Sequence, residues 1–204
     1  FSNNINIIKI DLSSVNEIKE LGSKLKKSKV THLVNNAGLS IFTHWKDRTE
    51  DEFDQVMNVN LKSVFFLSRF FINSCFKNKI KGRIINISSI YGMVSPDQNL
   101  YTKFNRRNSE VYGASKAGLI QMTKYFASQY NKTNVLVNAI APGGILNNKN
   151  PQHKDFLKKY SSKCPLNRLA NINEIIEPIL FLLSTDSEYI NGHTLTIDGG
   201  LMAL

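Results

Sequence analysis

Residues 109–118, with the sequence SEVYGASKAG, place Tyr112 and Lys116 at positions i and i+4 of a predicted helix. Two residues with this spacing lie on one face of a helix, so the ammonium group is expected beside the phenol. A phenol has an ordinary pKa of about 10, and a nearby positive charge favours its ionised form. We therefore expect Lys116 to lower the pKa of Tyr112, and Tyr112 to exchange a proton with a carbonyl or alcohol oxygen.

Short apolar runs that end in small or polar residues occur on both sides of this stretch. Residues 82–89 end in two serines, residues 32–38 end in Asn-Asn-Ala-Gly, and residues 134–144 end in Ala-Pro-Gly-Gly. A fourth run, residues 194–200, ends in Asp-Gly-Gly. Ligands of open α/β sheets bind beyond the carboxyl ends of the strands. Ser88 and Ser89 are therefore expected at the ligand-binding edge of the sheet, whereas Asp198-Gly199-Gly200 is interpreted as structural or interfacial.

These segments together resemble the short-chain dehydrogenase/reductase family. The matching segments, in the order usual for the family, are Asn35-Asn36-Ala37-Gly38, Asn58-Val59-Asn60-Leu61, Ile87-Ser88-Ser89, Tyr112-x-x-x-Lys116, Pro142-Gly143 and Asp198-Gly199-Gly200. The resemblance implies an α/β fold with a Rossmann-type doubly wound parallel sheet, in one domain over residues 1–204. It also implies an NAD(P)-dependent oxidoreductase that uses NAD or NADP, a choice that the sequence does not settle. The hydride would pass between the nicotinamide and a carbonyl or secondary alcohol.

The resemblance also implies catalytic roles. Tyr112 is the expected general acid/base, and Lys116 is expected to tune it and to bond the nicotinamide ribose. Ser89 is expected to hydrogen-bond the substrate oxygen, with Ser88 as the alternative. Asn60 resembles the family Asn that holds a water in a proton relay to Lys116, although an N-cap role would also explain it.

A second group of residues is expected to contact the cofactor. Small residues allow close approach of a ligand to the backbone. The residues that match the family's cofactor contacts, besides Tyr112 and Lys116, are Asp11, Leu12, Asn36, Ala37, Gly38, Pro142, Gly143 and Ile145. Asp11 also fits an ordinary helix cap, and residues 36–38 also fit a tight turn. The four His residues are dispersed, so no metal site is expected.

The sequence departs from the family pattern in two places. The glycine-rich turn Thr-Gly-x-x-x-Gly-x-Gly, which holds the cofactor pyrophosphate, does not occur in it. We therefore expect a fold without the first β-α-β unit, an N-terminally truncated sequence, and weak cofactor binding by these 204 residues. The second departure is a long segment between Ser89 and Tyr112. Residues 94–108 are predicted to form an irregular flap beside Tyr112.

The pattern of apolar residues predicts the individual elements. Strands are expected at residues 5–10, 30–35, 84–87, 135–140 and 194–197. Helices are expected at residues 15–26, from Thr49 with Glu52 as its capping-box partner, and at 59–76, 109–130 and 173–183. The helix at 59–76 is apolar on more than one face, which favours a homodimer or homotetramer.

Composition restricts the other partners. The net charge is +10, but the Lys residues are dispersed along the sequence, so we expect no nucleic-acid partner. No apolar run is long enough for a membrane span, and no secretion signal opens the sequence, so no membrane partner is expected. Its two cysteines, Cys75 and Cys164, have no metal or redox spacing. A reduced, cytoplasmic protein is the simplest interpretation.

Three functions remain open at this point. The pattern Ser-Ser-Ile-Tyr-Gly at residues 88–92, followed by Pro-Asp and a second Tyr, is similar to family members from surface-glycan and flagellin sugar pathways. A small-molecule substrate derived from a sugar is therefore the first expectation. A 3-oxoacyl group on an acyl carrier protein is the first alternative. A non-catalytic truncated remnant that acts as an interaction subunit is the second.

Overall fold

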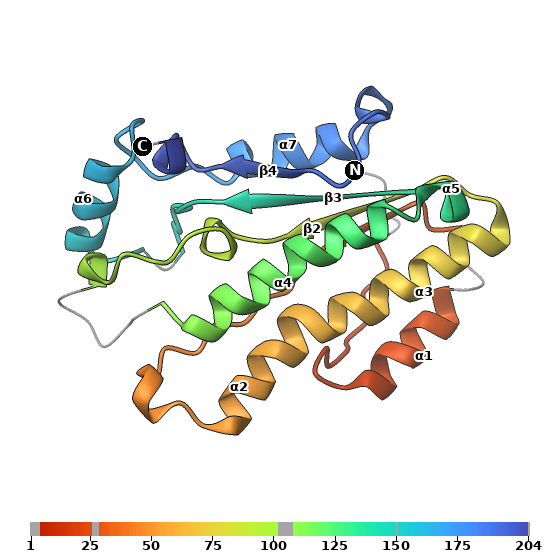
Figure 1. Cartoon of the computed structure of the whole chain (residues 1–204), viewed down its shortest axis with the longest axis horizontal. Helices are drawn as coiled ribbons and strands as arrows, with labels where there is room; N and C mark the ends of the chain where they lie inside the picture. The colour runs from red at the N-terminus through yellow and green to blue at the C-terminus, as the bar shows by residue number, and fades with distance from the viewer. Residues whose placement is uncertain (1–4, 26–28, 102–107, 150, 204) are drawn as a thin grey trace.

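A four-stranded parallel sheet forms the centre of the computed structural model, which describes residues 5–25, 29–101, 108–149 and 151–203. The strands lie in the order β1-β2-β3-β4 (Figure 1). Their bounds are β1 His32–Asn35, β2 Gly82–Ile87, β3 Val135–Pro142 and β4 Thr194–Ile197. All three ladders are parallel, which confirms the predicted α/β class with a parallel sheet.

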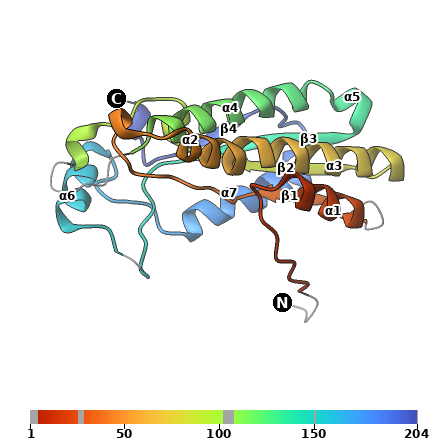
Figure 2. The same ribbon diagram turned by 90° about the horizontal axis from the view of Figure 1, so that it is seen from below.

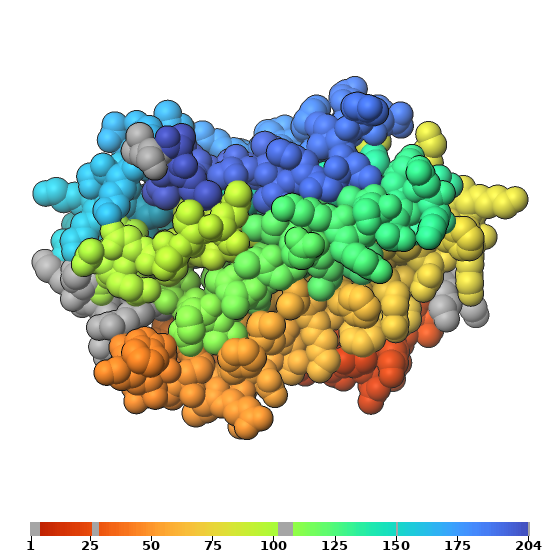
Figure 3. Space-filling view, in the orientation of Figure 1, coloured from red at the N-terminus to blue at the C-terminus, as the bar shows by residue number. Residues whose placement is uncertain are grey.

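Helices cover both faces of this sheet. Ile84 packs against α3 (Ser63–Asn78) and α4 (Glu110–Ala127), whereas the next residue, Ile85, packs on the opposite face with α7 (Asn173–Leu183). Successive side chains of a strand point to opposite faces, and a sheet buried on both faces needs apolar residues at consecutive positions. The runs of Ile and Val that predicted the strands therefore reflect burial on both faces. Figure 3 shows α3 and α4 running side by side across one surface of the molecule.

The predicted helix start at Thr49 is confirmed. Thr49 and Glu52 form a capping box at the start of α2 (Glu50–Met57). The sequence predicted a separate helix at 59–76, but α2 continues through a π-helical turn, η2 (Asn58–Lys62), directly into α3. The π turn carries Asn60, and such turns often occur at functional sites.

Helix α1 (Val15–Leu25) lies against α3 and close to its predicted range of 15–26 (Figure 2). The contact is close because Gly22 has no side chain. A Cβ at this position would lie 2.5 Å from the ring of Phe70. Ile18 of the same helix is fully buried.

The predicted strand at residues 5–10 is wrong. These residues are extended but pair with no strand among the described residues, and Ile5 and Ile7 are 80% and 90% exposed. A strand forms only where a neighbouring strand supplies ladder hydrogen bonds. An apolar run is therefore not sufficient to form one.

Several further elements complete the described part of the fold. Helix α6 (Lys154–Lys163) was not predicted, and the helix predicted at 109–130 ends at Ala127 and is followed by α5 (Tyr130–Thr133). Short helical turns are η1 Trp45–Asp47, η3 Ile90–Gly92, η4 Gln98–Tyr101, η5 Thr185–Ser187 and η6 Leu201–Ala203. The turns η3 and η4 belong to the long segment between Ser89 and Tyr112.

Candidate active site

The carboxyl ends of β1, β2 and β3 meet at a cleft of about 380 Å³ that α4 borders. Its lining residues are Asn36, Gly38, Leu39, Ser40, Phe42, Ile87, Ser88, Ser89, Tyr91, Asn108, Tyr112, Lys116, Pro142, Gly143 and Ile145. Eight of them are residues that the sequence predicted for catalysis or cofactor binding: Asn36, Gly38, Ser89, Tyr112, Lys116, Pro142, Gly143 and Ile145. The cleft therefore brings residues at the carboxyl ends of β1, β2 and β3 together with Tyr112.

Two glycines bring η3 and α4 into direct backbone contact. A Cβ on Gly92 would lie 2.7 Å from the carbonyl carbon of Lys116, and a Cβ on Gly113 would lie 2.9 Å from the carbonyl oxygen of Tyr91. Real Cβ atoms do not come this close to backbone atoms, so both positions require Gly. This packing fixes Ser89, at the start of η3, next to the turn of α4 that carries Tyr112.

The Tyr112 phenol lies beside the Ser89 hydroxyl. Burial raises the pKa of Tyr112, and the hydrogen bond with Ser89 lowers it by a smaller amount. Lys116 does not contribute to the shift, so the net direction is opposite to the one expected from the sequence. Burial is the stronger effect because the phenolate has less contact with water. Tyr112 is therefore protonated at neutral pH and can donate a proton to an oxygen atom.

Lys116 is buried, and burial lowers its pKa to about 8. Its Nζ atom donates a hydrogen bond of 2.6 Å to the Ile87 carbonyl and lies 5.5 Å from the centre of the Tyr112 ring. An ammonium group has three N–H donors, and two of those of Lys116 have no partner among the described residues. Lys116 can therefore bind hydroxyl groups of a ligand in the cleft.

Asn60 connects α4 to the loop that follows β1. Its Oδ1 accepts from the Leu39 N–H at 2.7 Å, and its Nδ2 donates to the Leu39 carbonyl at 2.9 Å and to the Ser115 hydroxyl at 3.0 Å. Both amide hydrogens are used, and one acceptor position on Oδ1 is left. The structure therefore gives Asn60 a positioning function, and its place in a water relay stays a prediction.

The two candidate serines have different surroundings. Ser88 donates to the Lys116 carbonyl at 2.9 Å, whereas the Ser89 oxygen accepts from the Tyr91 N–H at 3.1 Å and lies beside Tyr112. Ser88 thus fixes the strand end to α4. Ser89 is the serine whose hydroxyl lies beside the Tyr112 phenol.

The residues predicted to bind cofactor separate into two regions. Asn36, Ala37 and Gly38 form an exposed turn at the cleft. A Cβ on Gly38 would lie 3.5 Å from Lys116 Nζ. The exposed backbone of this small-residue segment leaves room for a ligand, and its expected contact with the adenosine part of the cofactor stays a prediction. Asp11 and Leu12 are not among the described residues that line the cleft. The Asp11 N–H donates to the Glu17 carboxylate, and the Asp11 carboxylate accepts from the Ser13 N–H. Their cofactor role stays a prediction.

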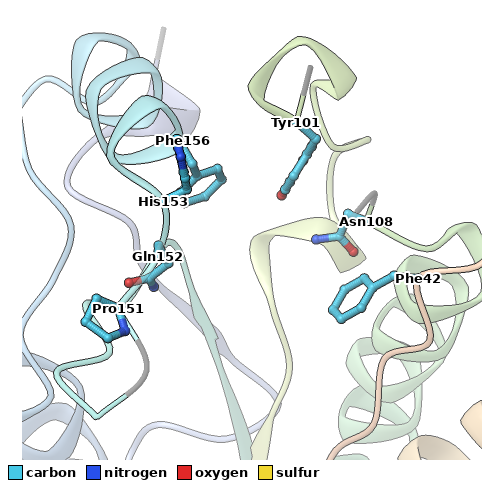
Figure 4. Close-up of a pocket in the computed structure, with 8 residues that line it drawn as sticks. Phe42, Tyr101, Asn108, Pro151, Gln152, His153 and Phe156 are labelled. Atoms are coloured by element: carbon cyan, nitrogen blue, oxygen red, sulfur yellow. The ribbon is translucent and has the colours of Figure 1, made fainter. Parts of the chain in front are cut away.

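A second cavity of about 270 Å³ adjoins the first, since Phe42 and Asn108 line both. Figure 4 shows Phe42, Tyr101 and Asn108 on one side and Pro151, Gln152, His153 and Phe156 on the other. The ring of Tyr101 lies 5.5 Å from that of Phe156, and its hydroxyl lies 3.2 Å from the Tyr91 hydroxyl. Tyr101 and Asn108 belong to the predicted flap, whose residues 102–107 lie outside the described residues.

Several residues of these cavities were not predicted from the sequence. Leu39, Ser40 and Phe42 follow the Asn-Asn-Ala-Gly turn, and that proximity was the available signal. Gln152, His153 and Phe156 lie around the start of α6, which has few buried residues and a polar composition, so its sequence gave no comparable signal.

The described residues contain neither a membrane-spanning helix nor a metal cluster. No helix in the described ranges is both long and apolar enough to cross a membrane. The described side chains also contain no cluster of three or more His, Cys, Asp or Glu residues suited to a metal ion. Cys75 and Cys164 are both buried free thiols.

Known proteins resemble this chain in sequence and in structure. A family model described as enoyl-(acyl carrier protein) reductase matches residues 2–202. The 3-oxoacyl-[acyl-carrier-protein] reductase FabG of Thermotoga maritima is 35% identical over 199 residues, which cover 95% of this chain and 75% of that protein. The 2-dehydro-3-deoxy-D-gluconate 5-dehydrogenase of Dickeya dadantii is 35% identical over 178 residues, which cover 86% of this chain and 66% of that protein.

A solved structure shows the same fold. A short-chain dehydrogenase from Leptospira borgpetersenii with bound NAD+ superposes with a TM-score of 0.90 and 39% sequence identity. The match covers 98% of this chain and 76% of the Leptospira chain. The family model, the Thermotoga relative and the Leptospira structure each cover nearly the whole of this chain. The chain belongs to the short-chain dehydrogenase/reductase family.

Proposed function

We propose that this protein is an NAD(P)-dependent oxidoreductase that interconverts a carbonyl and a secondary alcohol, with a sugar derivative as substrate. The observation that carries the proposal is the arrangement of Ser89, Tyr112 and Lys116 around one cleft. A hydroxyl, a protonated phenol and an ammonium group at one site can bind a carbonyl oxygen and protonate it. The same cleft offers the exposed turn at residues 36–38 for the cofactor.

Each residue has a defined part in this mechanism. Ser89 hydrogen-bonds the substrate oxygen and holds it near the phenol. Tyr112 donates its proton to that oxygen in reduction and removes it in oxidation. Lys116 binds the ribose and holds a positive charge near Tyr112, since a pKa of about 8 leaves it mostly protonated at neutral pH. The bound nicotinamide supplies or accepts the hydride, so that a carbonyl, a hydride and a proton together give the alcohol.

Cofactor binding is supported by the fit of the cleft and by the relatives. The Leptospira structure carries NAD+. In this chain, residues 36–38 would contact the adenosine through their backbone, the loop of Pro142, Gly143 and Ile145 would lie against the nicotinamide, and Lys116 would bond the nicotinamide ribose. Either NAD or NADP is compatible with these contacts. Titration of the native protein with NADH and NADPH, followed by cofactor fluorescence, tests the proposal and separates the two.

A sugar derivative is the favoured substrate because aromatic and amide side chains line the adjoining cavity. The Dickeya relative is named for a sugar-acid substrate. The direct test measures NADH or NADPH oxidation with a ring polyol ketone, 2-keto-myo-inositol, and with acetoacetyl-coenzyme A. Faster reduction of the polyol ketone supports the sugar derivative. Turnover of neither compound, with bound cofactor, would contradict the proposed activity on both substrate classes.

A 3-oxoacyl thioester is the second candidate. It is favoured by the Thermotoga reductase, which aligns with 95% of this chain, compared with 86% for the Dickeya relative. Reduction of acetoacetyl-coenzyme A at a higher kcat/KM than the polyol ketone would establish this alternative.

We further propose a homodimer or homotetramer in the cytoplasm. Phe65 and Phe76 of α3 are 37% and 64% exposed, and Tyr125 of α4 is 62% exposed on the neighbouring helix. Apolar groups gathered on adjacent helices favour an interface between subunits. The two free thiols are usual in a reducing compartment. Sedimentation velocity of the native protein tests the oligomeric state.

A further inference from the structure

Asn108 lies at the junction of the two cavities. It lines both of them and also a third hollow beside Trp45 and Pro96. Its Oδ1 atom is buried without a hydrogen-bond partner among the described residues. Figure 4 shows its amide nitrogen directed to the cavity, between Tyr101 and Phe42. Rotation of the amide would turn the unpaired Oδ1 toward the cavity, where it can accept a hydrogen bond from a ligand hydroxyl.

A second unpaired polar group lines the same cleft. The Ser40 hydroxyl oxygen is buried and has no hydrogen-bond partner within the described part of the chain. Buried polar groups in native proteins almost always have partners, and leaving one unpaired costs about 1–3 kcal/mol. Two such groups at one cleft therefore point to a ligand that supplies the missing partners.

Arg48 holds the neighbours of Asn108 in place. Its guanidinium donates to the carbonyls of Ile41 and Thr43, on either side of Phe42, and to the hydroxyl of Ser109 at 3.3 Å. It also donates to the Glu110 carboxylate at 2.9 Å. The arginine side chain is only 6% exposed. The loop that carries Phe42 and the chain next to Asn108 are thus fixed to each other before a ligand binds, which is required of a selective site.

Few ionisable side chains line the described part of the two cavities. Lys116 and His153 are the basic residues there, and this described lining contains no Asp, Glu or Arg. Lys116 lies at the catalytic end. The rings of Phe42, Tyr101 and Phe156 form apolar walls. A ring or chain with hydroxyl groups suits these described walls.

We propose that Asn108, with Ser40, is a specificity-determining residue that hydrogen-bonds a second oxygen of the substrate. The preferred substrate is then a hydroxyketone, or the corresponding diol, rather than a plain ketone. This inference rests on the proposed oxidoreductase function. A site built to bond a substrate oxygen rejects an analogue that lacks it, because its own polar groups are then left unpaired.

The test compares two ketones that differ by one hydroxyl, 2-hydroxycyclohexanone and cyclohexanone. Their dissociation constants are measured by ligand-observed NMR in the native protein and in Ser40→Ala, Asn108→Leu and Asn108→Ala. The matched control is Asn131→Leu, an exposed position on α5. Because the preference is a ratio within one protein sample, a smaller folded fraction in a variant does not change it. NADH- or NADPH-dependent turnover of both ketones is measured separately.

The native protein and Asn131→Leu should bind the hydroxyketone at least tenfold more tightly, as one well-placed hydrogen bond predicts. Both Asn108 variants should reduce the preference to below about threefold, and Ser40→Ala should reduce it partly. A native preference below threefold, or one that Asn108→Leu and Asn108→Ala leave unchanged, overturns the inference. A preference in binding without turnover of either ketone supports the inference and instead counts against the proposed oxidoreductase activity.

Discussion

Asn60 holds the backbone of Leu39 with two hydrogen bonds, one to its N–H at 2.7 Å and one to its carbonyl at 2.9 Å. This pair fixes the loop after the Asn36–Gly38 turn to the π turn between α2 and α3. We expect Asn60→Leu to lower the free energy of unfolding by about 2 kcal/mol, because buried groups lose their partners. Urea unfolding measures the change. The Asn60→Leu substitution should also weaken cofactor binding.

The matched control for Asn60→Leu is Asn73→Leu, at an exposed position of α3, the helix that continues from the π turn carrying Asn60. It should leave both the unfolding free energy and cofactor affinity close to the native values. Equal losses in the two variants would mean that the Asn60–Leu39 pair does not support the cofactor loop.

The contact between η3 and α4 depends on two glycines. Gly92→Ala should destabilise the protein by about 1–3 kcal/mol, because its Cβ would meet three backbone atoms of Lys116 and Ala117 at 2.7–2.9 Å. Gly118→Ala in α4 is the control, since its Cβ would meet the movable side chain of Leu61 at 3.0 Å. Thermal unfolding of both variants should separate them. Similar transition temperatures would show that the backbone contact is not tight.

Arg48 and Arg168 both pair with carboxylates, but in different surroundings. Arg48 is 6% exposed and bonds two carbonyls besides its Glu partners, whereas Arg168 forms a two-bond pair with Glu174 and is 48% exposed. Lysine cannot reproduce the branched donor set of arginine. Arg48→Lys should therefore cost about 2 kcal/mol of unfolding free energy, and Arg168→Lys less than about 1 kcal/mol. Chemical denaturation of both variants checks this order, and the reverse order would contradict it.

The lowered pKa of Lys116 predicts a pH dependence of stability. Between pH 8 and the ordinary value near 10.5, the unfolded chain keeps a proton that the folded chain has lost. Raising the pH through this window therefore favours the folded state. The unfolding free energy of the native protein, minus that of Lys116→Met, should rise by up to about 3 kcal/mol from pH 7.5 to pH 10.5. A difference that stays constant or falls would show that Lys116 is not buried as a cation.

The strands and most helices could be predicted because their patterns are local. Ile84 and Ile85 are apolar at consecutive positions since helices cover both faces of the sheet, and Thr49 with Glu52 marks a helix start within four residues. Residues 5–10 show the limit of this argument. Their apolar run is typical of a strand, but strand formation depends on a neighbour elsewhere in the chain.

The residues of the cleft were predicted better than their electrostatics. The positions of Ser89, Tyr112 and Lys116 followed from motifs, but the direction of the Tyr112 pKa shift depends on burial, which involves residues distant in sequence. The unpaired state of Asn108 is also a property of the folded chain. It depends on which partners the surrounding loops do not supply.

The most direct test of the account is Tyr112→Phe in the native protein, because the change removes the proton donor and keeps the ring. With the ketone that the native protein reduces best, turnover should fall by at least about a thousandfold, within the range of acid–base catalysis. NADH and NADPH affinity should stay within about threefold of native, since the phenyl ring fills the same space. Turnover within about tenfold of native, a barrier change of only ~1.4 kcal/mol, would contradict the assignment of Tyr112 as the catalytic acid.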